Sequence, residues 1–339
     1  MKNTIIFLLL IYCSVATPQQ PESRLTIVFY NTENLYDTLD APGTDDSGFT
    51  PGGVKKWNSQ KYFRKVNDLG RVLSSIDEKK LPEIIGLSGV ENIRVLQDLV
   101  RSKPLEKAGY EIVHKDSPDK QGSDVAFLFR KDQFRLSGKD FIPVQFPFDS
   151  SLTIRDILHV YGELSDGRLV HFFVNHWSSR DGGQRETESQ RMYCAVALRR
   201  AVDMLLSRDS RARIIIMGDF NDEPTNKSLM NVVQCSNKRK NIAVGEFYNL
   251  MYDQHNLNPT GSCFYQGSWS MMDQIIVSPN MLSAFSGFGC NYESAKVFQK
   301  DWMIISKKEG VPEPHATYDG DTYSGGVSDH LPVYVVLEK

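Results

Sequence analysis

The sequence predicts an α/β fold built on mixed β-sheets. Short apolar segments rich in Ile, Val and Phe alternate with stretches of helical periodicity, which is the pattern of an α/β protein. Two of these segments, 157–163 and 169–175, follow each other without room for a helix between them, so we expect antiparallel as well as parallel strand pairs. A chain of 339 residues that is 40% hydrophobic can bury a large core, and we expect one domain.

Several segments have the length and the β-branched or aromatic content of buried strands. They are residues 25–30, 83–88, 124–129, 157–163, 169–175, 213–218, 274–278 and 331–337. Because these segments are apolar through most of their length, we expect sheets that are covered on both faces.

Helices are predicted at 60–76, 93–100 and 185–206. In the first and the last of these segments, apolar residues recur at steps of three and four, which makes one buried stripe on each helix. The stripe residues are Phe63, Val66, Leu69, Val72, Leu73 and Ile76 in the first helix, and Ala195, Leu198, Val202 and Leu205 in the last. Residues 42–57 and 306–326 are rich in turn-forming residues and predict exposed loops.

The first 16 residues have the organisation of a secretory signal peptide. Lys2 precedes an apolar run over residues 5–16, and Ser14, Val15 and Ala16 match the small-x-small cleavage rule. The run is shorter than the roughly 20 residues that a spanning helix needs, so we expect no stable membrane insertion. The predicted organisation is a signal peptide (1–16), a short linker (17–24) and a single domain (25–339), exported to the periplasm or the cell exterior.

Charge and cysteine content limit the function classes. The net charge of −3 argues against a dedicated, tight polynucleotide binder, which usually presents a basic surface. Four cysteines follow the predicted signal peptide, and their spacing matches no zinc motif. In an exported protein they can form one or two disulfides, and buried free thiols are the alternative. They are Cys194, Cys235, Cys263 and Cys290.

Residues 214–224 place a carboxylate and an amide at the end of a buried strand. Asp219 and Asn221 are two positions apart, so both side chains can point to one side before the chain turns at Glu223 and Pro224. An ordinary Asp/Asn turn would produce the same local pattern. The motif therefore gains weight only from similar residues elsewhere.

Other strand ends carry the same kind of side chain. Asp329 and His330 stand immediately before the last predicted strand, where one suits a hard cation and the other a proton or a phosphate oxygen. The structural alternative for this pair is an ordinary surface Asp and His. For Asp273 the alternative is a helix or strand cap, and for His176 it is a buried, hydrogen-bonded histidine. The full set at strand ends is Asn31, Glu33, His176, Asp219, Asn221, Asp273, Asp329 and His330. Oxygen donors dominate it, which predicts Mg²⁺, or Mn²⁺ or Ca²⁺, rather than zinc.

These motifs, in this order, resemble the endonuclease/exonuclease/phosphatase family, and the resemblance covers essentially all of residues 25–338. It rests on Asn31-x-Glu33, Asn175-His176-Trp177, Gly218-Asp219-Phe220-Asn221, Asp273-Gln274 and Ser328-Asp329-His330-Leu331-Pro332. The family includes deoxyribonuclease I, exonuclease III, sphingomyelinases and inositol-phosphate phosphatases. The resemblance implies a four-layer sandwich in which two mixed sheets pack face to face between helices.

The resemblance also implies roles for the site residues. Asp219 would orient or deprotonate the attacking water, with Asn221 beside it on the phosphate. His330, paired with Asp273, would contact the phosphate, and His176 would donate to a phosphate oxygen. Asn31, Glu33 and Asp329 would help to hold the metal. We expect Arg155 and Arg180 to be ordinary surface arginines, with phosphate contact as the alternative.

One position departs from the family pattern. Members usually carry a metal-binding glutamate at the end of the second core strand, and this chain has Gly89 there. Glu91 lies two residues further on, roughly 6 to 7 Å along an extended strand, which is too far for a simple substitution without a bulge. We expect Glu91 to have a separate task, such as starting the helix at 93–100, and the metal site to be weakened.

The expected function is therefore an exported, divalent-metal-dependent phosphodiesterase or nuclease, acting as a monomer on a phosphodiester such as DNA or RNA. One alternative is a weakly active or inactive member that binds a phosphorylated ligand, which Gly89 favours. Another is an enzyme similar to a sphingomyelinase or an inositol-phosphate phosphatase.

Overall fold

The structure is a computed structural model that describes residues 23–257, 261–282, 287–306 and 310–339. The predicted signal peptide and nearly all of the predicted linker lie outside the described residues. No helix in the described part of the chain is long and apolar enough to cross a membrane.

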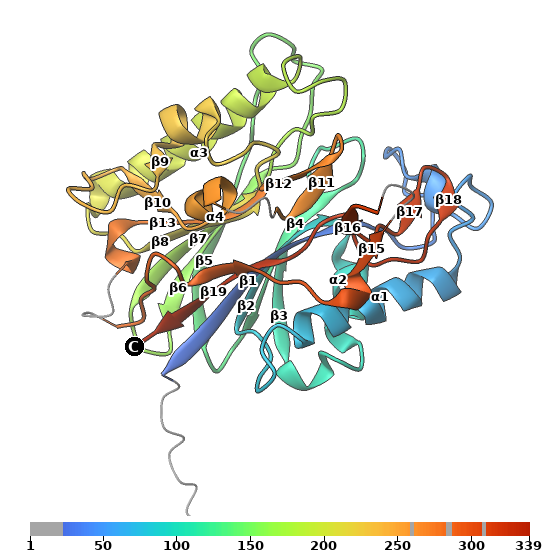
Figure 1. Ribbon diagram of the computed structural model, residues 1–339, viewed down its shortest axis with the longest axis horizontal. Helices are drawn as coiled ribbons and strands as arrows, with labels where there is room; N and C mark the ends of the chain where they lie inside the picture. Colours follow the sequence, from blue (N-terminus) through green and yellow to red (C-terminus); the bar gives the residue numbers. More distant parts are fainter. Residues whose placement is uncertain (1–22, 258–260, 283–286, 307–309) are drawn as a thin grey trace, which may run out of the picture.

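Two large mixed sheets form the centre of the molecule (Figure 1). In order across the first sheet, the strands are β14 (Ala295–Val297), β19 (Val333–Glu338), β1 (Arg24–Leu35), β2 (Ile84–Val90), β4 (Asp124–Arg130) and β3 (Tyr110–His114). Across the second sheet they are β5 (Phe134–Ile142), β6 (Ile157–Leu164), β7 (Leu169–His176), β8 (Ile214–Asp219), β13 (Asp273–Val277), β10 (Phe247–Asn249) and β9 (Cys235–Ser236). Each sheet has a parallel pair near its centre, β1 with β2 and β7 with β8, and β9 and β10 form a further parallel pair at the edge of the second sheet.

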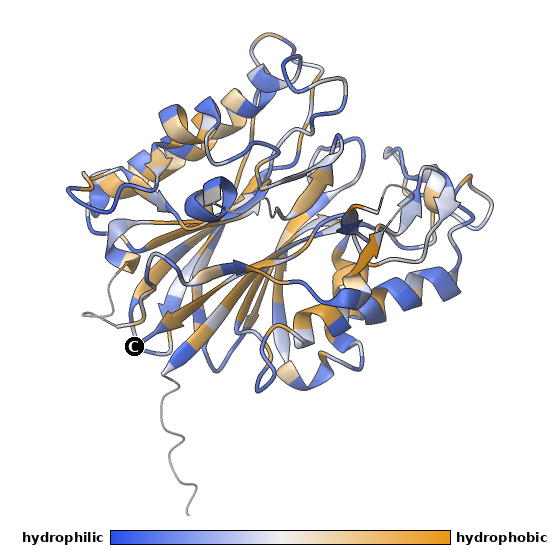
Figure 2. Cartoon of the chain, in the orientation of Figure 1, coloured by the Kyte–Doolittle hydropathy of each residue, from blue (hydrophilic) through white to orange (hydrophobic). Residues whose placement is uncertain are grey.

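Helices cover the outer faces of both sheets. The helices α1 (Ser59–Ser74) and α2 (Ile93–Arg101) pack on the first sheet, and α3 (Glu188–Arg208) packs on the second. A shorter helix, α4 (Tyr252–Leu257), follows β10. The hydropathy colouring shows apolar strands between helices whose outer faces are polar (Figure 2). The predicted four-layer α/β sandwich is confirmed.

Aromatic rings fill the space between the two sheets. Phe172 of β7 lies 5.2 Å from Phe127 of β4 and 5.6 Å from Phe134 of β5, measured between ring centroids. All three side chains are buried in one apolar cluster that joins the two sheets. Burying such rings removes apolar surface from water and fixes the distance between the sheets.

Every strand predicted from the sequence is present, with ends shifted by a few residues. Strands β3, β5, β9, β10 and β14 of the two sheets were not predicted. The longest of them, β5, was missed because most of its residues are partly or fully exposed and show no regular alternation. The prediction of a plain loop at 306–326 was wrong, since two short hairpins form there. They pair β15 (Ile304–Ser306) with β16 (Pro312–Pro314) and β17 (Tyr318–Asp319) with β18 (Thr322–Tyr323). Strands this short leave no periodic pattern in a sequence.

The predicted stripe of the first helix needs one correction. Phe63 is 50% exposed, whereas Tyr62 and Lys65 are buried with Val66 and Leu69. The buried face is therefore centred slightly to one side of the predicted stripe, and Phe63 packs against Tyr62 at its border.

We expect Phe172→Ala to lower the free energy of unfolding by about 3–5 kcal/mol, because it leaves a cavity between the sheets. Phe63→Ala removes the same ring from an exposed site and is the matched control, with an expected loss below about 1 kcal/mol. Urea denaturation of both variants measures the difference. Equal losses in the two variants would contradict the inter-sheet role of Phe172.

Candidate active site

Strand ends from both sheets meet at one edge of the sandwich and line a cleft of about 420 Å³. Residues His176, Asp219 and Asp273 are direct neighbours across β7, β8 and β13. In the first sheet, Asn31 stands where the regular pairing of β1 with β2 ends, and Gly89 is the last but one residue of β2. Of the predicted site residues, the cleft is lined by Asn31, Glu33, His176, Asp219, Asn221, Asp329 and His330.

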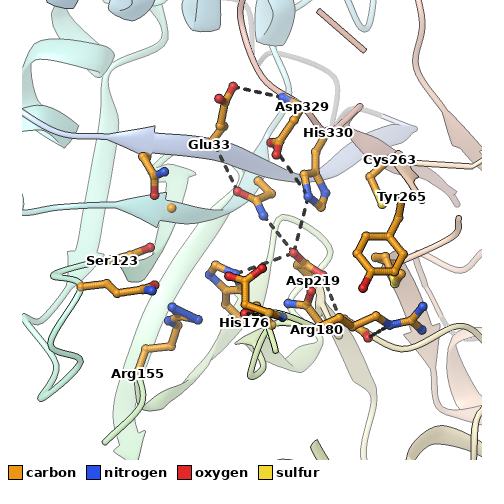
Figure 3. A pocket seen from close by; sticks show the side chains of 18 of the residues that line it. Glu33, Ser123, Arg155, His176, Arg180, Asp219, Cys263, Tyr265, Asp329 and His330 are labelled. Carbon is orange, nitrogen blue, oxygen red and sulfur yellow. Dashed lines mark hydrogen bonds and ion pairs between the residues drawn. The ribbon is translucent and has the colours of Figure 1, made fainter. Parts of the chain in front are cut away.

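Asp219 lies at the centre of the cleft, between two histidines (Figure 3). Its Oδ2 is 3.7 Å from His176 Nε2 and 3.8 Å from His330 Nε2. The same oxygen accepts a hydrogen bond of 2.9 Å from Asn31 Nδ2. The side chain is only 2% exposed, so its carboxylate is held in one orientation toward the cleft.

Asp273 lies behind His330 rather than in the cleft wall. Its Oδ2 is 2.6 Å from His330 Nδ1, and its side chain is fully buried. Burial alone would lower the pKa of His330, but Asp273, Asp219 and Asp329 together raise this pKa well above its usual value. His330 is therefore held as a cation that points Nε2 toward Asp219.

His176 has the opposite environment. Burial lowers the pKa of His176 well below its usual value, and the positive charges of Arg155 and His330 lower it further. Its Nδ1 is buried and has no hydrogen-bond partner. The cleft thus combines one charged and one neutral imidazole, which can serve as different kinds of donor.

A left-handed residue ends the Asp219 motif. Asn221 has φ +50°, a conformation that Asn tolerates better than most residues. Its backbone N–H donates to Asp219 Oδ1 at 2.9 Å, and its Nδ2 donates to the carbonyl of Trp177 at 3.1 Å. The Asp/Asn turn and the cleft motif, which were alternatives in the sequence, are therefore the same structure.

Glu33 and Asp329 form the acidic side of the cleft, and Lys65 contacts it from behind. Glu33 Oε2 accepts the backbone N–H groups of Thr317 at 2.7 Å and Asp329 at 3.1 Å. Burial and the nearby Asp329 carboxylate raise the pKa of Glu33 to about 7. Lys65, which the sequence analysis missed, is buried and donates to the Glu33 carbonyl and to Thr317 Oγ1. The detectable signal was a lysine within the apolar face of a helix.

This side of the cleft fits a hard divalent cation. Its donors are the oxygens of Asn31, Glu33 and Asp329, with Asp219 adjacent. Burial and the nearby Asp329 carboxylate raise the pKa of Glu33 because they make its charged form unfavourable, and a cation bound beside it would offset that cost. Among the described residues, Asp219, Asp273 and His330 also have ligand atoms within 4.8 Å of one another. The last two already bind each other, so the oxygen set is the better candidate.

Gly89 lines the cleft beside Asn31, at the position where the family pattern has glutamate. Its φ is +75°, and the pairing of β2 with β4 shifts register between Ser88 and Val90. A Cβ atom at this position would lie 2.9 Å from Asn31 Oδ1. The backbone is therefore bulged in a way that favours glycine, and a glutamate cannot simply be restored there.

Glu91 does not occupy the missing position. Its Oε2 accepts the backbone N–H of Asp37 at 2.5 Å, and Glu91 is absent from the cleft wall. The prediction that Glu91 does not replace the missing glutamate is confirmed. The prediction that Glu91 starts the helix at 93–100 was wrong. Asn92 caps α2, accepting the N–H groups of Arg94 and Val95.

The expectation that Arg155 and Arg180 are surface arginines was wrong, since each is 6% exposed and lines the cleft. Arg155 binds Asp119 Oδ2 through Nε at 3.2 Å and Nη2 at 2.8 Å. Arg180 donates from Nε to the carbonyl of Asn221 at 2.7 Å. The partners of these arginines are far away in the sequence, and one of them is a carbonyl group in a turn. The burial of Arg155 and Arg180 therefore leaves no local pattern in the sequence.

The four cysteines are free and buried. Burial raises the pKa of the Cys194 thiol to about 11 and that of Cys235 to about 12. Of the two alternatives left by the sequence, the structure has the free thiols.

The two facing sheets and the Asp-His cleft at their common edge define a phosphoesterase-type α/β sandwich. The family model described as "Endonuclease/Exonuclease/phosphatase family" matches residues 26–339. The chain belongs to this family of hydrolases, whose enzymes are typically dependent on divalent metals. No curated protein matches the sequence significantly.

Solved structures share the fold at low sequence identity. A mannosyl-6-phosphatase from Bacteroides thetaiotaomicron is 19% identical with a TM-score of 0.57, and the match covers 93% of this chain and 100% of that one. TDP2 from D. rerio, in complex with a single-strand DNA product, is 14% identical with a TM-score of 0.55 and coverage of 94% and 100%. The human Nocturnin catalytic domain, with bound sulfate, is 16% identical with a TM-score of 0.54 and coverage of 94% and 95%.

A left-handed backbone conformation costs an alanine about 1–2 kcal/mol. We expect Gly89→Ala to lower the free energy of unfolding by more than this amount. The added Cβ also meets Asn31 Oδ1. Gly167→Ala is the control, because Gly167 has φ +79° with nothing within 4 Å of an added Cβ. Thermal and urea unfolding of both variants measure the excess, and a smaller loss at position 89 would contradict the predicted clash.

Glu91 gives the stability a pH dependence. Burial, and then the charges of Asp37 and Asp46, raise the pKa of Glu91 to about 7, against an ordinary value of 4.5. The folded state therefore binds more protons than the unfolded state between these values, and its stability falls as the pH rises from 4.5 to 7. We expect Glu91→Gln to flatten this decline in urea titrations without metal. An unchanged slope would show that Glu91 does not cause it.

Proposed function

We propose that this protein is a divalent-metal-dependent phosphodiesterase, exported from the cell and active as a monomer. The main observation that supports this proposal is that Asp219 lies between His176, whose imidazole is neutral, and His330, whose imidazole is charged. A phosphodiester attacked in line needs a positioned water, donors for the developing negative charge and a cation. The cleft offers residues for each of these requirements.

The roles follow from the positions. Asp219 orients the water and accepts its proton as the water oxygen bonds to phosphorus and the bond to the leaving alcohol breaks. His330, kept charged by Asp273, and His176 donate to the phosphate oxygens. Asn221, fixed by its bond to the Trp177 carbonyl, borders the phosphate. Buried arginines are suited to phosphate contact, and Arg155 and Arg180 extend the row of donors.

Asn31, Glu33 and Asp329 would hold the metal, which we propose to be Mg²⁺, with Mn²⁺ or Ca²⁺ as alternatives. When bound, the metal supplies Lewis-acid stabilisation of the charge on phosphate. Lys65 beside Glu33 and glycine at position 89 reduce the negative charge that this set presents. We therefore expect metal binding to be weaker than a full set of carboxylates would give.

A second candidate is a protein that binds a phosphorylated ligand without cleaving it. Gly89 is the observation that favours it, because the cleft lacks the family glutamate and the bulge makes its return difficult. The intact arrangement of Asp219, Asp273 and His330 favours the enzyme. A polynucleotide is our first choice of substrate, and a sphingomyelin-like or inositol-phosphate-like ester is the second.

We expect Asp219→Asn to lower kcat on bis(p-nitrophenyl) phosphate by about 10²- to 10⁴-fold, because the amide cannot accept the proton of water. Asp203→Asn, which changes the exposed acid of an ion pair on α3, is the matched control and should keep full activity. Activity should vanish with a chelator and return with Mg²⁺.

A wild-type chain that binds inorganic phosphate but cleaves no DNA, RNA, choline phospholipid or inositol phosphate with Mg²⁺, Mn²⁺ or Ca²⁺ would establish the binding protein instead. Cleavage that survives both Asp219→Asn and the chelator would contradict the mechanism.

A further inference from the structure

A second cluster of metal-ligating side chains lies outside the cleft, where the chain passes from β3 to β4 (Figure 1). His114 is the last residue of β3, Asp124 is the first residue of β4, and Asp116 follows His114 by two positions. Each residue offers one ligand atom, and these three atoms lie within 4.8 Å of one another. The two strands pair directly, so the sheet holds His114 and Asp124 close together.

The imidazole of His114 has the orientation that is typical of metal-binding histidines. Its Nδ1 lies 3.1 Å from the carbonyl oxygen of Val125, and a nitrogen that bonds to a carbonyl must carry the proton. The other ring nitrogen, Nε2, faces two carboxylates, at 3.1 Å from Asp116 Oδ1 and 4.0 Å from Asp124 Oδ2. In metal sites the ligating histidine commonly donates its second N–H to such a carbonyl.

Asp124 has one carboxylate oxygen with hydrogen-bond donors and one without. Ser117 donates to Oδ1 from its backbone N–H at 3.1 Å and also from its hydroxyl group. Among the residues that the structure describes, none donates a hydrogen bond to Oδ2, although the side chain is only 3% exposed. A carboxylate oxygen in such a place is costly without a partner, and a bound cation would remove that cost.

The spacing of the ligand atoms fits Zn²⁺. Nitrogen and oxygen ligands lie about 2.0–2.2 Å from Zn²⁺, so two ligands at a tetrahedral angle are roughly 3.4 Å apart. The two distances from His114 Nε2, 3.1 and 4.0 Å, lie on either side of this value. Asp116 is 79% exposed, so its side chain can adjust to a bound ion. An imidazole ligand favours Zn²⁺ over Mg²⁺ and Ca²⁺, which prefer oxygen ligands.

The three ligands stand at the two ends of the loop 115–123, which contributes to the wall of the cleft. Gln121 of this loop lines the cleft. Asp119 of the same loop binds Arg155, another residue of the cleft wall, at 2.8 Å. An ion held by ligands at both ends would close the loop and reduce the number of conformations open to it.

We propose that His114, Asp116 and Asp124 bind a Zn²⁺ ion that ties the ends of the loop 115–123 together and orders this wall of the cleft. Three protein ligands leave one position of a four-coordinate ion to water. The proposal does not depend on the proposed function, because all three ligands lie outside the cleft wall and binding is measured without a substrate. The competing interpretation is a protonated His114 that forms ion pairs with both carboxylates and binds no metal.

Calorimetry with Zn²⁺ on the full chain, stripped of metal and then placed in excess Mg²⁺, tests the site. Mg²⁺ occupies oxygen ligands and leaves a histidine site open to Zn²⁺. We expect one Zn²⁺ per chain, and a loss of affinity of at least about 10- to 100-fold in Asp116→Ala and in His114→Gln. Because Asp116 is exposed, Asp116→Ala should fold normally. Asp203→Ala, which removes another exposed acid, is the matched control and should bind Zn²⁺ as the wild type does.

Trypsin cleavage after Lys120 reports on the loop, because Lys120 is exposed within it. Zn²⁺ should slow this cleavage severalfold in the wild-type protein and leave it unchanged in Asp116→Ala. Zn²⁺ should also raise the midpoint of thermal unfolding in the wild type, since a ligand of the folded state stabilises that state.

Absence of Zn²⁺ binding in excess Mg²⁺ would overturn the site and establish the ion-paired histidine. Equal affinity in the wild type, Asp116→Ala and His114→Gln would overturn it as well, because the ion would then lie elsewhere. Zn²⁺ binding that requires both residues but leaves cleavage after Lys120 unchanged would overturn the ordering of the loop.

Discussion

The register of three adjacent strands is the constraint on which the site depends. His176, Asp219 and Asp273 face one another across β7, β8 and β13, so the hydrogen-bond ladder of the sheet sets their spacing. A shift of one residue in any of these strands would turn the side chain to the opposite face. Alternate residues of these strands pack into two apolar clusters, one between the sheets and one under α3, and a shift would exchange side chains between them. The packing of the core thereby maintains the geometry of the cleft.

The sequence was sufficient for the framework because the central strands are apolar and the polar residues mark their ends. Asp219 and His330 could be identified because each stands in a dense local motif. Lys65 and Arg155 could not, because what gives them a role is a contact with residues far along the chain. The two short hairpins of β15–β18 and the bulge at Gly89 depend on tertiary packing, which leaves little periodic signal in the sequence.

The acidic side of the cleft departs from a strongly charged metal site through two linked features. At Gly89 the chain forms a bulge and has no carboxylate where the family pattern has one. The buried side chain of Lys65 lies behind Glu33. Both features lower the net negative charge around Asn31 and Asp329. The histidine side, in contrast, contains the short contact of His330 with the fully buried Asp273. The cleft therefore holds His330 firmly against Asp273 and presents fewer charges on its acidic side.

The pairing of β1 with β19 brings the two ends of the described chain together. Arg24 pairs with Glu338 and Phe29 with Val333, and His330 lies directly before this last strand. During synthesis, β1 leaves the ribosome early but must wait for its neighbour until nearly all of the domain has emerged. The Asp273–His330 pair can form only at that stage. A nascent or truncated chain consequently has most of the hydrophobic core in its sequence but cannot assemble the candidate active site.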